Sequence, residues 1–399
     1  MEQENLIIES ESKRLEFKES LSLKEEIPKD NENSKKLTHC PYCQGKLIKR
    51  GKRKKKFEEV QRYYCSKCDK SLISAVTKNK TYPLRIIIDS LTLYNRLYSL
   101  EEISNIIYER YGIKISSRIV LIWVKEYEKY IPFLRMREFI SQKYSKKEII
   151  EESKLIHQQI YNFKYHRAKT NLILNERFNH FKFKPLQEFL GLVVAECPHQ
   201  LFQNPSKRAS EFKDIFNLEQ VKIISKENSA IKTANFVMQT ISNNKLRHEI
   251  LQNFMLSNDS VTVAVEVPVL ISNEDILHYK YQLDFNVPLT IKEGEYITGH
   301  IDLIQIRNGL IHIMDFKPSA KKEKPIAQLT IYALALSRLT GLRLYNFKCA
   351  WFDNKNYYEF FPLHVVYKLK KRKRIPRDQK KLSTPLDAQI NYKENEKKN

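Results

Sequence analysis

The sequence predicts a multidomain α+β protein, and three observations support that prediction. Two Cys-x-x-Cys pairs lie close together near the N-terminus. Residues 83–130 then show the apolar periodicity, the proline start and the glycine stop of short helices. The C-terminal half alternates apolar, strand-like runs with helical segments, which indicates an α/β domain.

Length and charge narrow the classes of function. A chain of 399 residues has room for two or three domains. Its net charge of +23 points to nucleic acid as the first choice of partner, although charge alone fits a membrane surface equally well. Residues 1–4 lack the start of a signal peptide, and no apolar run reaches the length of a spanning helix. We therefore expect no membrane partner and a cytoplasmic, nucleoid-associated protein, or a nuclear one in a nucleated cell.

The N-terminal region divides into a leader and a cysteine-containing segment. Residues 1–36 have few large apolar groups, which predicts a disordered leader. Residues 37–78 carry the two cysteine pairs at the spacing of a tetrahedral zinc site. The four predicted zinc ligands are Cys40, Cys43, Cys65 and Cys68. Two disulfides are the alternative, but a reducing compartment is expected without a secretion signal, so we predict a structural zinc ribbon.

A run of cationic side chains lies between the cysteine pairs. It includes Arg53, Lys54 and Lys55. Such a run is often only a solvated surface. On a zinc-stabilised ribbon of a basic protein, we interpret it as a surface that contacts DNA phosphates.

Residues 83–131 predict three helices. Pro83 begins the first, residues 99–102 read as a capping box for the second, and Gly112 ends the second. Ser116 is the expected N-cap of a third helix that runs to about residue 130. This is the outline of a helix-turn-helix DNA-binding domain, with a structural helical hairpin as the alternative.

The third of these helices is the expected recognition helix. Ser117 and Arg118 should face DNA, whereas Ile119, Ile122 and Trp123 should pack inward.

Residues 40–130 together resemble the zinc-ribbon and helix-turn-helix head of insertion-sequence transposases. Residues 99–103, 111–116 and 123–125 carry the likeness. The resemblance implies binding to specific double-stranded DNA, such as the ends of a mobile element. It stops there, because no convincing set of the three acidic residues of an RNase H-like domain follows residue 130.

Two further segments are assigned from composition. Residues 132–185 alternate lysine, glutamate and aliphatic residues, which predicts a helical connector. His157 within it has no partner at metal-ligand spacing, so we expect a surface or partly buried role for it. Residues 366–399 predict a basic, disordered tail.

A predicted β-hairpin places two carboxylates and a lysine close together in the α/β domain. Asn308-Gly309 suits the two positive-φ positions of a type I′ turn between strands at about 297–307 and 310–317. Counting outward from that turn places Asp302 opposite Asp315, and Lys317 on the same face.

Two carboxylates at such a distance repel each other unless a cation or a proton lies between them. Mg²⁺ or Mn²⁺ suits the position, because it is commonly held by one or two carboxylates while substrate phosphate oxygens and water complete its shell. The ion would stabilise a phosphodiester transition state and acidify an attacking water. Lys317 would orient that water or neutralise the phosphate. The alternative is an exposed edge hairpin in which Lys317 is a simple counter-ion.

Three spaced motifs carry a family resemblance. They are Gly299-x-x-Asp302, Asp315-x-Lys317 and, on a predicted helix, Gln328-x-x-x-Tyr332. This set resembles the PD-(D/E)XK nuclease superfamily in its RecB-like branch, over residues 186–365. The resemblance implies a restriction-endonuclease-like α/β domain and a metal-dependent DNA phosphodiesterase. It assigns Asp302 and Asp315 as metal ligands, Lys317 as the catalytic lysine, and Gln328 and Tyr332 as supporting residues.

A further ligand from the first helix of such domains stays open between Glu227, His248 and Glu249. Glu266, on the first core strand, is the best candidate for lining the site, because an acid among β-branched residues needs a partner. Some RecB-like nucleases also hold an iron–sulfur cluster through four cysteines. This half of the chain offers only Cys197 and Cys349, so we predict no such cluster.

The leading hypothesis is a DNA endonuclease whose N-terminal half finds the site and whose C-terminal half cuts it, in a mobile element or in DNA repair or defence. One alternative is a sequence-specific DNA-binding regulator with an inactive nuclease fold. Another is an exonuclease or a nuclease of branched DNA. Cutting both strands with one such site generally needs two protomers or two events, so a homodimer is also an open alternative.

Overall fold

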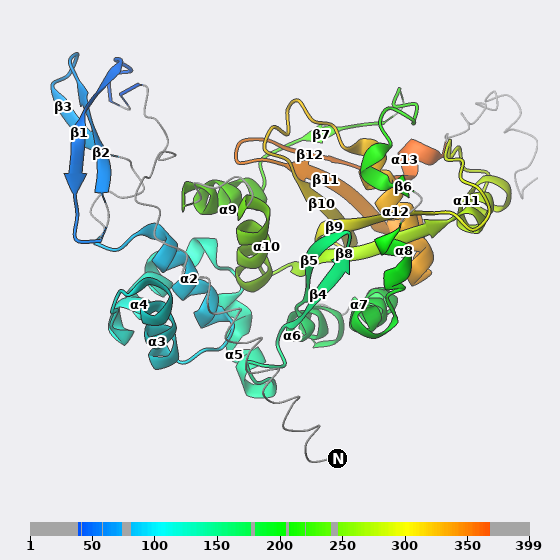
Figure 1. Ribbon diagram of the computed structural model, residues 1–399, viewed down its shortest axis with the longest axis horizontal. Helices are drawn as coiled ribbons and strands as arrows, with labels where there is room; N and C mark the ends of the chain where they lie inside the picture. The colour runs from blue at the N-terminus through cyan, green and yellow to red at the C-terminus, as the bar shows by residue number, and fades with distance from the viewer. Residues whose placement is uncertain are drawn as a thin grey trace, which may run out of the picture.

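The computed structural model describes residues 39–367, apart from residues 41, 58, 74–80, 177–179, 205–206, 220 and 241–245. The described chain has a small ribbon, a helical unit and a large mixed sheet flanked by helices (Figure 1). The predictions for the leader at residues 1–36 and for nearly all of the tail at residues 366–399 lie outside the described residues.

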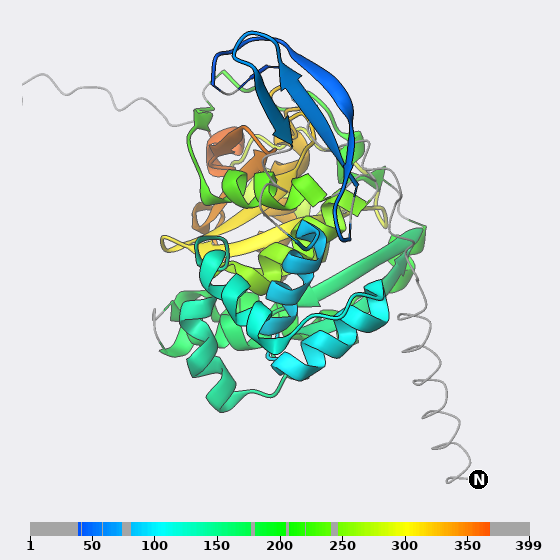
Figure 2. The ribbon, with the colours of Figure 1, turned by 90° about the vertical axis from the view of Figure 1, so that its left-hand side faces the viewer.

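The ribbon is a three-stranded antiparallel sheet with a core of its own. Its strands are β1 (Leu47–Lys54), β2 (Glu59–Cys65) and β3 (Lys70–Ile73). The buried cluster consists of Cys40, Leu47, Tyr63 and Cys65. The ribbon stands apart from the large sheet in Figure 1 and lies above the N-terminal helices in Figure 2.

The helical unit has the predicted boundaries at most of its ends. It consists of α2 (Leu84–Asn95), α3 (Leu100–Tyr111) and α4 (Ser117–Glu126). Ser99 and Glu102 form the predicted capping box, and Gly112 ends α3 in the left-handed conformation at a φ of 64°. The third helix is shorter than expected, because α4 gives way to a 3₁₀ turn, η1 (Glu128–Tyr130).

The buried face of α4 differs from the prediction at one position. Trp123 is buried as expected, but Ile122 is 49% exposed. Val120 and Val124 are buried in its place, since residues spaced by three and four share a helix face.

The helical unit shares one hydrophobic core with the large sheet, from α2 through to the last described helix. A buried polar contact joins the two parts: Asn95 Nδ2 donates to Asn258 Oδ1 at 2.8 Å. Asn258 Nδ2 in turn donates to Thr92 Oγ1 at 3.1 Å. The helices are therefore packed onto the sheet domain and are not a separate body on a linker.

The prediction of a helical connector over residues 132–185 is wrong for much of that segment. Its elements are α5 (Leu134–Lys143), β4 (Glu151–His157), β5 (Gln159–Tyr165), α6 (Arg167–Asn171) and the π turn η2 (Leu172–Glu176). Leu155 and His157 are buried in β4, and Phe163 and Tyr165 are buried in β5. That alternation has the period of two of a half-buried strand, and Gln158, at a φ of 63°, makes the tight turn.

The large sheet has nine strands in the order β4-β5-β8-β9-β10-β11-β12-β7, with β6 paired to β9. The remaining strands are β6 (Lys207–Arg208), β7 (Ile224–Ser225), β8 (Thr262–Ser272), β9 (Tyr296–Arg307), β10 (Leu310–Phe316), β11 (Phe347–Phe352) and β12 (Tyr357–Phe360). β10 and β11 are parallel, so a crossover must join them, and the helix α12 lies in that crossover.

The helices around the sheet are α7 (Lys184–Glu196), α8 (His199–Gln203), α9 (Ser229–Val237), α10 (Arg247–Asn258), α11 (Asn273–Leu277), α12 (Ile326–Thr340) and α13 (Leu363–Val366). Shorter turns are η3 (Phe181–Phe183), η4 (Ala209–Glu211), η5 (Met238–Thr240), η7 (His278–Gln282) and η8 (Leu344–Asn346). Among the described helices, none has the length and apolar character needed to cross a membrane.

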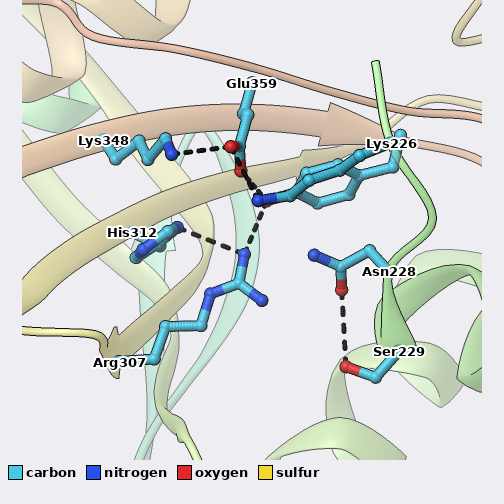
Figure 3. A network of polar contacts seen from close by, with 8 residues as sticks. Lys226, Asn228, Ser229, Arg307, His312, Lys348 and Glu359 are labelled. Atoms are coloured by element: carbon cyan, nitrogen blue, oxygen red, sulfur yellow. Dashed lines mark hydrogen bonds and ion pairs between the residues drawn. The ribbon is translucent and has the colours of Figure 1, made fainter. Parts of the chain in front are cut away.

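A network of ion pairs and hydrogen bonds around the buried Glu359 links β9, β11 and β12 near the β7 edge of this sheet (Figure 3). Glu359 of β12 is 1% exposed and accepts from Lys226 Nζ at 2.7 Å and Lys348 Nζ at 2.6 Å. Tyr357 donates to the same carboxylate at 3.2 Å and accepts from Arg307 at 2.6 Å. Burial alone would raise the pKa of Glu359, but the hydrogen bonds from the two lysines lower it.

Replacing Glu359 with alanine should destabilise the fold by about 3 to 5 kcal/mol, because Lys348 would then be buried beside no counter-charge. Denaturant unfolding measures the change. Lys226→Ala is the matched control. That side chain is 42% exposed, so its loss should cost about 1 kcal/mol or less. A cost below about 1 kcal/mol for Glu359→Ala would contradict the prediction.

Candidate active site

The hairpin β9–β10 has the predicted register. Its pairs run from Arg307 opposite Leu310 to Leu303 opposite Met314. Asn308 and Gly309 have φ values of 52° and 69°, the two positive values of a type I′ turn. One step beyond the last pair, the side chains of Asp302 and Asp315 lie close enough to affect each other's pKa.

Two cationic or ionisable side chains meet this carboxylate pair. Lys317 Nζ lies 2.9 Å from Asp315 Oδ2. His248 Nδ1, on α10, lies 3.3 Å from Asp302 Oδ2, which also accepts from the backbone N–H of Phe316 at 3.2 Å. The two strands and α10 therefore bring oxygen and nitrogen donors to one place.

The two carboxyl groups differ in their proton affinity. Burial, followed by the negative charge of Asp302, raises the pKa of Asp315 well above its usual range. Burial also acts to raise the pKa of Asp302, but the hydrogen bond and charge of His248 outweigh it and lower that pKa. Repulsion between the two acids thus concentrates the negative charge on Asp302 when no cation lies between them.

The donor set fits a hard divalent cation. Asp315 Oδ2 is buried and accepts no well-aligned hydrogen bond within the described chain, although Lys317 lies beside it. A buried oxygen in that position is suited to coordinate an ion, and two carboxylates match the preference of Mg²⁺ or Mn²⁺.

The positions of Glu227, His248 and Glu249 distinguish between these three candidates for a further metal ligand. His248 contacts Asp302, whereas the Glu249 side chain accepts from Asn162 Nδ2 at 3.3 Å. Glu227 lies between β7 and α9, next to Lys226 of the buried ion network at the sheet edge. Of these three candidates, His248 is the one that the structure places against the acidic pair.

Glu266 lies on β8 close enough to Asp302 for the two charges to interact. Burial, followed by the charge of Asp302, raises the pKa of Glu266 to about 8. Its Oε1 accepts from Gln252 Nε2 at 2.6 Å, and its backbone adopts a φ of 51°. A non-glycine residue in that left-handed region costs free energy, and such strain often accompanies functional sites.

Gln328 and Tyr332 share one face of α12, as predicted. Gln328 Nε2 donates to the Tyr332 hydroxyl at 2.9 Å. The Tyr332 ring lies so close to β9 that a Cβ atom on Gly299 would be 2.3 Å from its Cε1. Gly299 is therefore needed so that the tyrosine can pack beside the acidic pair.

Replacing Gly299 with alanine should lower the free energy of unfolding by about 1 to 3 kcal/mol, because the new methyl group overlaps the Tyr332 ring. Thermal or denaturant unfolding provides the measurement. Gly191→Ala in α7 is the control, since nothing lies within 4 Å of its Cβ position and the helix should gain stability. Equal stability of the two variants would contradict the proposed role of Gly299.

The four ribbon cysteines also converge. The Sγ atoms of Cys40 and Cys68 are 3.6 Å apart, and those of Cys43 and Cys65 are 3.4 Å apart. All four lie within 4.8 Å of one another, the arrangement of a tetrahedral thiolate site, so the cluster fits an N-terminal zinc ribbon.

The predicted DNA-contacting residues occupy two surfaces. Arg53 and Lys54 are exposed on β1, and Lys55 follows them half-buried. Arg118 is exposed at the start of α4, where Ser117 is half-buried.

Part of the chain matches a known protein family. Residues 239–391 match the family described as the PD-(D/E)XK nuclease superfamily. The matched segment contains the acidic pair, Lys317, Gln328 and Tyr332. No curated protein and no solved structure matches the chain. The part of the chain that carries the acidic pair therefore matches the PD-(D/E)XK nuclease superfamily over residues 239–391.

Proposed function

We propose that this protein is a metal-dependent DNA endonuclease, carried to duplex DNA by its zinc ribbon and helix-turn-helix unit. The observation that supports the proposal is the meeting of Asp302, Asp315 and Lys317 at one end of the β9–β10 hairpin. The spaced motifs favour a RecB-like place within the superfamily.

Each side chain has a role that follows from its position. Asp302 and Asp315 would hold Mg²⁺ or Mn²⁺, with His248 as a nitrogen donor beside them. The bound ion supplies charge stabilisation for the phosphodiester transition state and a more acidic water. Lys317, half-buried at 2.9 Å from Asp315, is placed to neutralise a phosphate oxygen. Gln328 and Tyr332 pack behind the hairpin and Glu266 beside it, so they would keep the carboxylates in position.

The N-terminal half would supply DNA affinity. Arg53 and Lys54 on the ribbon and Arg118 on α4 are exposed cations on elements outside the nuclease region. Cations on such surfaces contact phosphates and make binding dependent on salt. The likeness of this head to those of transposases favours a defined DNA site, and cutting both strands there would call for a homodimer or two successive events.

Cleavage of supercoiled plasmid by the full chain tests the proposal. The reaction is run with Mg²⁺, Mn²⁺ or EDTA, beside Lys317→Ala and the exposed control Lys321→Ala. We expect metal-dependent nicking by the wild type and by the control, and loss of nicking in Lys317→Ala. Binding to labelled duplex DNA is measured in parallel and should be unchanged in both variants.

Cleavage that is equal with and without Lys317 would overturn the assignment of the site. Absence of cleavage under every metal condition, together with tight duplex binding, would favour a DNA-binding regulator. Digestion from linear ends without nicking of the plasmid would favour an exonuclease.

A further inference from the structure

A second cluster of metal-ligating side chains lies beside the nuclease site. It contains His157 at the end of β4, Cys197 at the end of α7, and His199 at the start of α8. Their ligand atoms all lie within 4.8 Å of one another. His300 of β9, two residues before Asp302, contacts the same cluster.

The contacts within the cluster are close. His157 Nε2 is 2.8 Å from His199 Nδ1, and His157 Nδ1 is 2.8 Å from His300 Nε2. His157 is only 2% exposed, which corrects the expectation of a surface or partly buried histidine without ligand partners. His199 and His300, the partners of His157, come from elements far apart in the chain, so the spacing of residues in the sequence could not predict these contacts.

Aromatic packing fixes the orientation of the imidazole rings. The Phe202 ring stacks on His157 with centroids 4.3 Å apart, and the Tyr161 ring stacks on His300 at 3.5 Å. Rings held in this way present their nitrogens in fixed directions, which is what a preformed metal site requires.

The arrangement of nitrogens matches a ligand histidine with its supporting partner. If His157 binds an ion through Nε2, its Nδ1–H can donate to His300 Nε2. Histidine ligands almost always donate their second N–H in this way, which fixes their tautomer. The alternative is a set of histidines that only hydrogen-bond to one another, and that arrangement does not explain the thiol beside them. The Cys197 Sγ atom lies within 4.8 Å of ligand nitrogens of both His157 and His199, close enough for all three to bind one ion.

We propose that His157 Nε2, His199 Nδ1 and the Cys197 thiolate bind a Zn²⁺ ion, which is distinct from the ribbon zinc and from the catalytic cation. Two imidazoles and a thiolate are zinc ligands, and water would complete a tetrahedral shell. Binding forms one Zn–S and two Zn–N bonds, and the proton of the Cys197 thiol passes to solvent.

The ion would join parts of the fold that are far apart in sequence. His157 belongs to the β4–β5 hairpin, whereas Cys197 and His199 connect α7 to α8. Through His300, the cluster also touches β9 just before Asp302. The ion would therefore hold the hairpin and the α7–α8 junction against the strand that carries the nuclease site.

The test is the zinc content of the full-length protein after loading and removal of free metal. We expect about two zinc ions per chain, one in the ribbon and one in this cluster. Cys197→Ser and His199→Gln should each reduce the content to about one, as should Cys65→Ser in the ribbon. His364→Gln is the matched control, since His364 is exposed and lies outside both sites, so it should retain both ions.

Alkylation of the wild-type protein gives a second readout that does not depend on a variant folding. Zinc should protect the Cys197 thiol from alkylation, as detected by mass spectrometry of its peptide, and chelation should remove that protection. About one zinc per chain in the wild type, with Cys197 alkylated equally with and without zinc, would overturn the proposal. Neither readout depends on nuclease activity, so the outcome is independent of the proposed function.

Discussion

Replacing Asp315 with asparagine should abolish metal-dependent DNA cleavage while the fold stays intact. The amide has nearly the shape of the carboxyl group but carries no charge, so only Asp302 would still offer a charged oxygen to a divalent cation. We expect cleavage to fall by about 10³-fold, which corresponds to about 4 kcal/mol of transition-state stabilisation. Plasmid nicking under single-turnover conditions provides the measurement, and duplex binding should be unchanged.

When metal is absent, the same substitution should make the folded protein more stable than the wild type. The pKa of Asp315 is raised in the folded protein above that of the unfolded chain, so ionisation of this group favours unfolding. The destabilisation is absent at pH values below the unfolded pKa and grows as the pH rises toward the folded pKa. In EDTA, Asp315→Asn should therefore unfold at a higher temperature than the wild type, with the larger difference toward alkaline pH.

Mg²⁺ should reverse that order, because the ion stabilises the ionised wild-type pair and has little to bind in the variant. Asp284→Asn is the control. Asp284 is exposed and has a φ of 53°, which asparagine also tolerates, so neither cleavage nor the response to Mg²⁺ should change. Cleavage by Asp315→Asn at the wild-type rate would show that Asp315 is not a ligand of the catalytic metal. Equal stabilisation of wild type and variant by Mg²⁺ would count against this carboxylate pair as the binding site.

The geometry around this pair was predictable from local sequence because a two-residue turn fixes everything outward from it. Asn308-Gly309 sets the register, and the period of two of a strand then brings Asp302 and Asp315 together. The capping box at Ser99 and the glycine stop of α3 were predictable for the same reason, since both are short-range.

Features that depend on distant partners were not predictable in this way. Residues 151–165 read as part of a helical connector because lysine and glutamate fill the exposed positions, and the pairing of β5 with β8 has no local signal in the sequence. The choice of His248 over Glu249 depends on how α10 is rotated against the hairpin. The period of the apolar residues in β4 and β5 was the signal that pointed to strands.

Disrupting the cysteine cluster of the ribbon should unfold the ribbon and leave the nuclease region folded. The ribbon core contains Cys40, Leu47, Tyr63 and Cys65, and is separate from the core that α2 shares with the large sheet. A segment this small rarely folds without a metal or a disulfide. Structural zinc supplies about 10 to 16 kcal/mol in such domains at neutral pH. Cys65→Ser should therefore make residues 39–73 sensitive to proteases without exposing the sheet.

The affinity of Cys65→Ser for duplex DNA should then show how much the ribbon contributes to binding. Loss of its ordered cations, Arg53 and Lys54 among them, should weaken duplex binding at low salt and reduce the dependence of affinity on salt concentration. Cys349→Ala is the control, because that thiol is buried in the large core and its loss leaves the ribbon intact. Plasmid nicking by Cys65→Ser should persist at high protein concentration, since the acidic pair lies outside the unfolded segment. If Cys65→Ser bound DNA like the wild type at every salt concentration, the interaction would have to come from the helices or the nuclease region, and the exposed cations of β1 would be only a solvated surface.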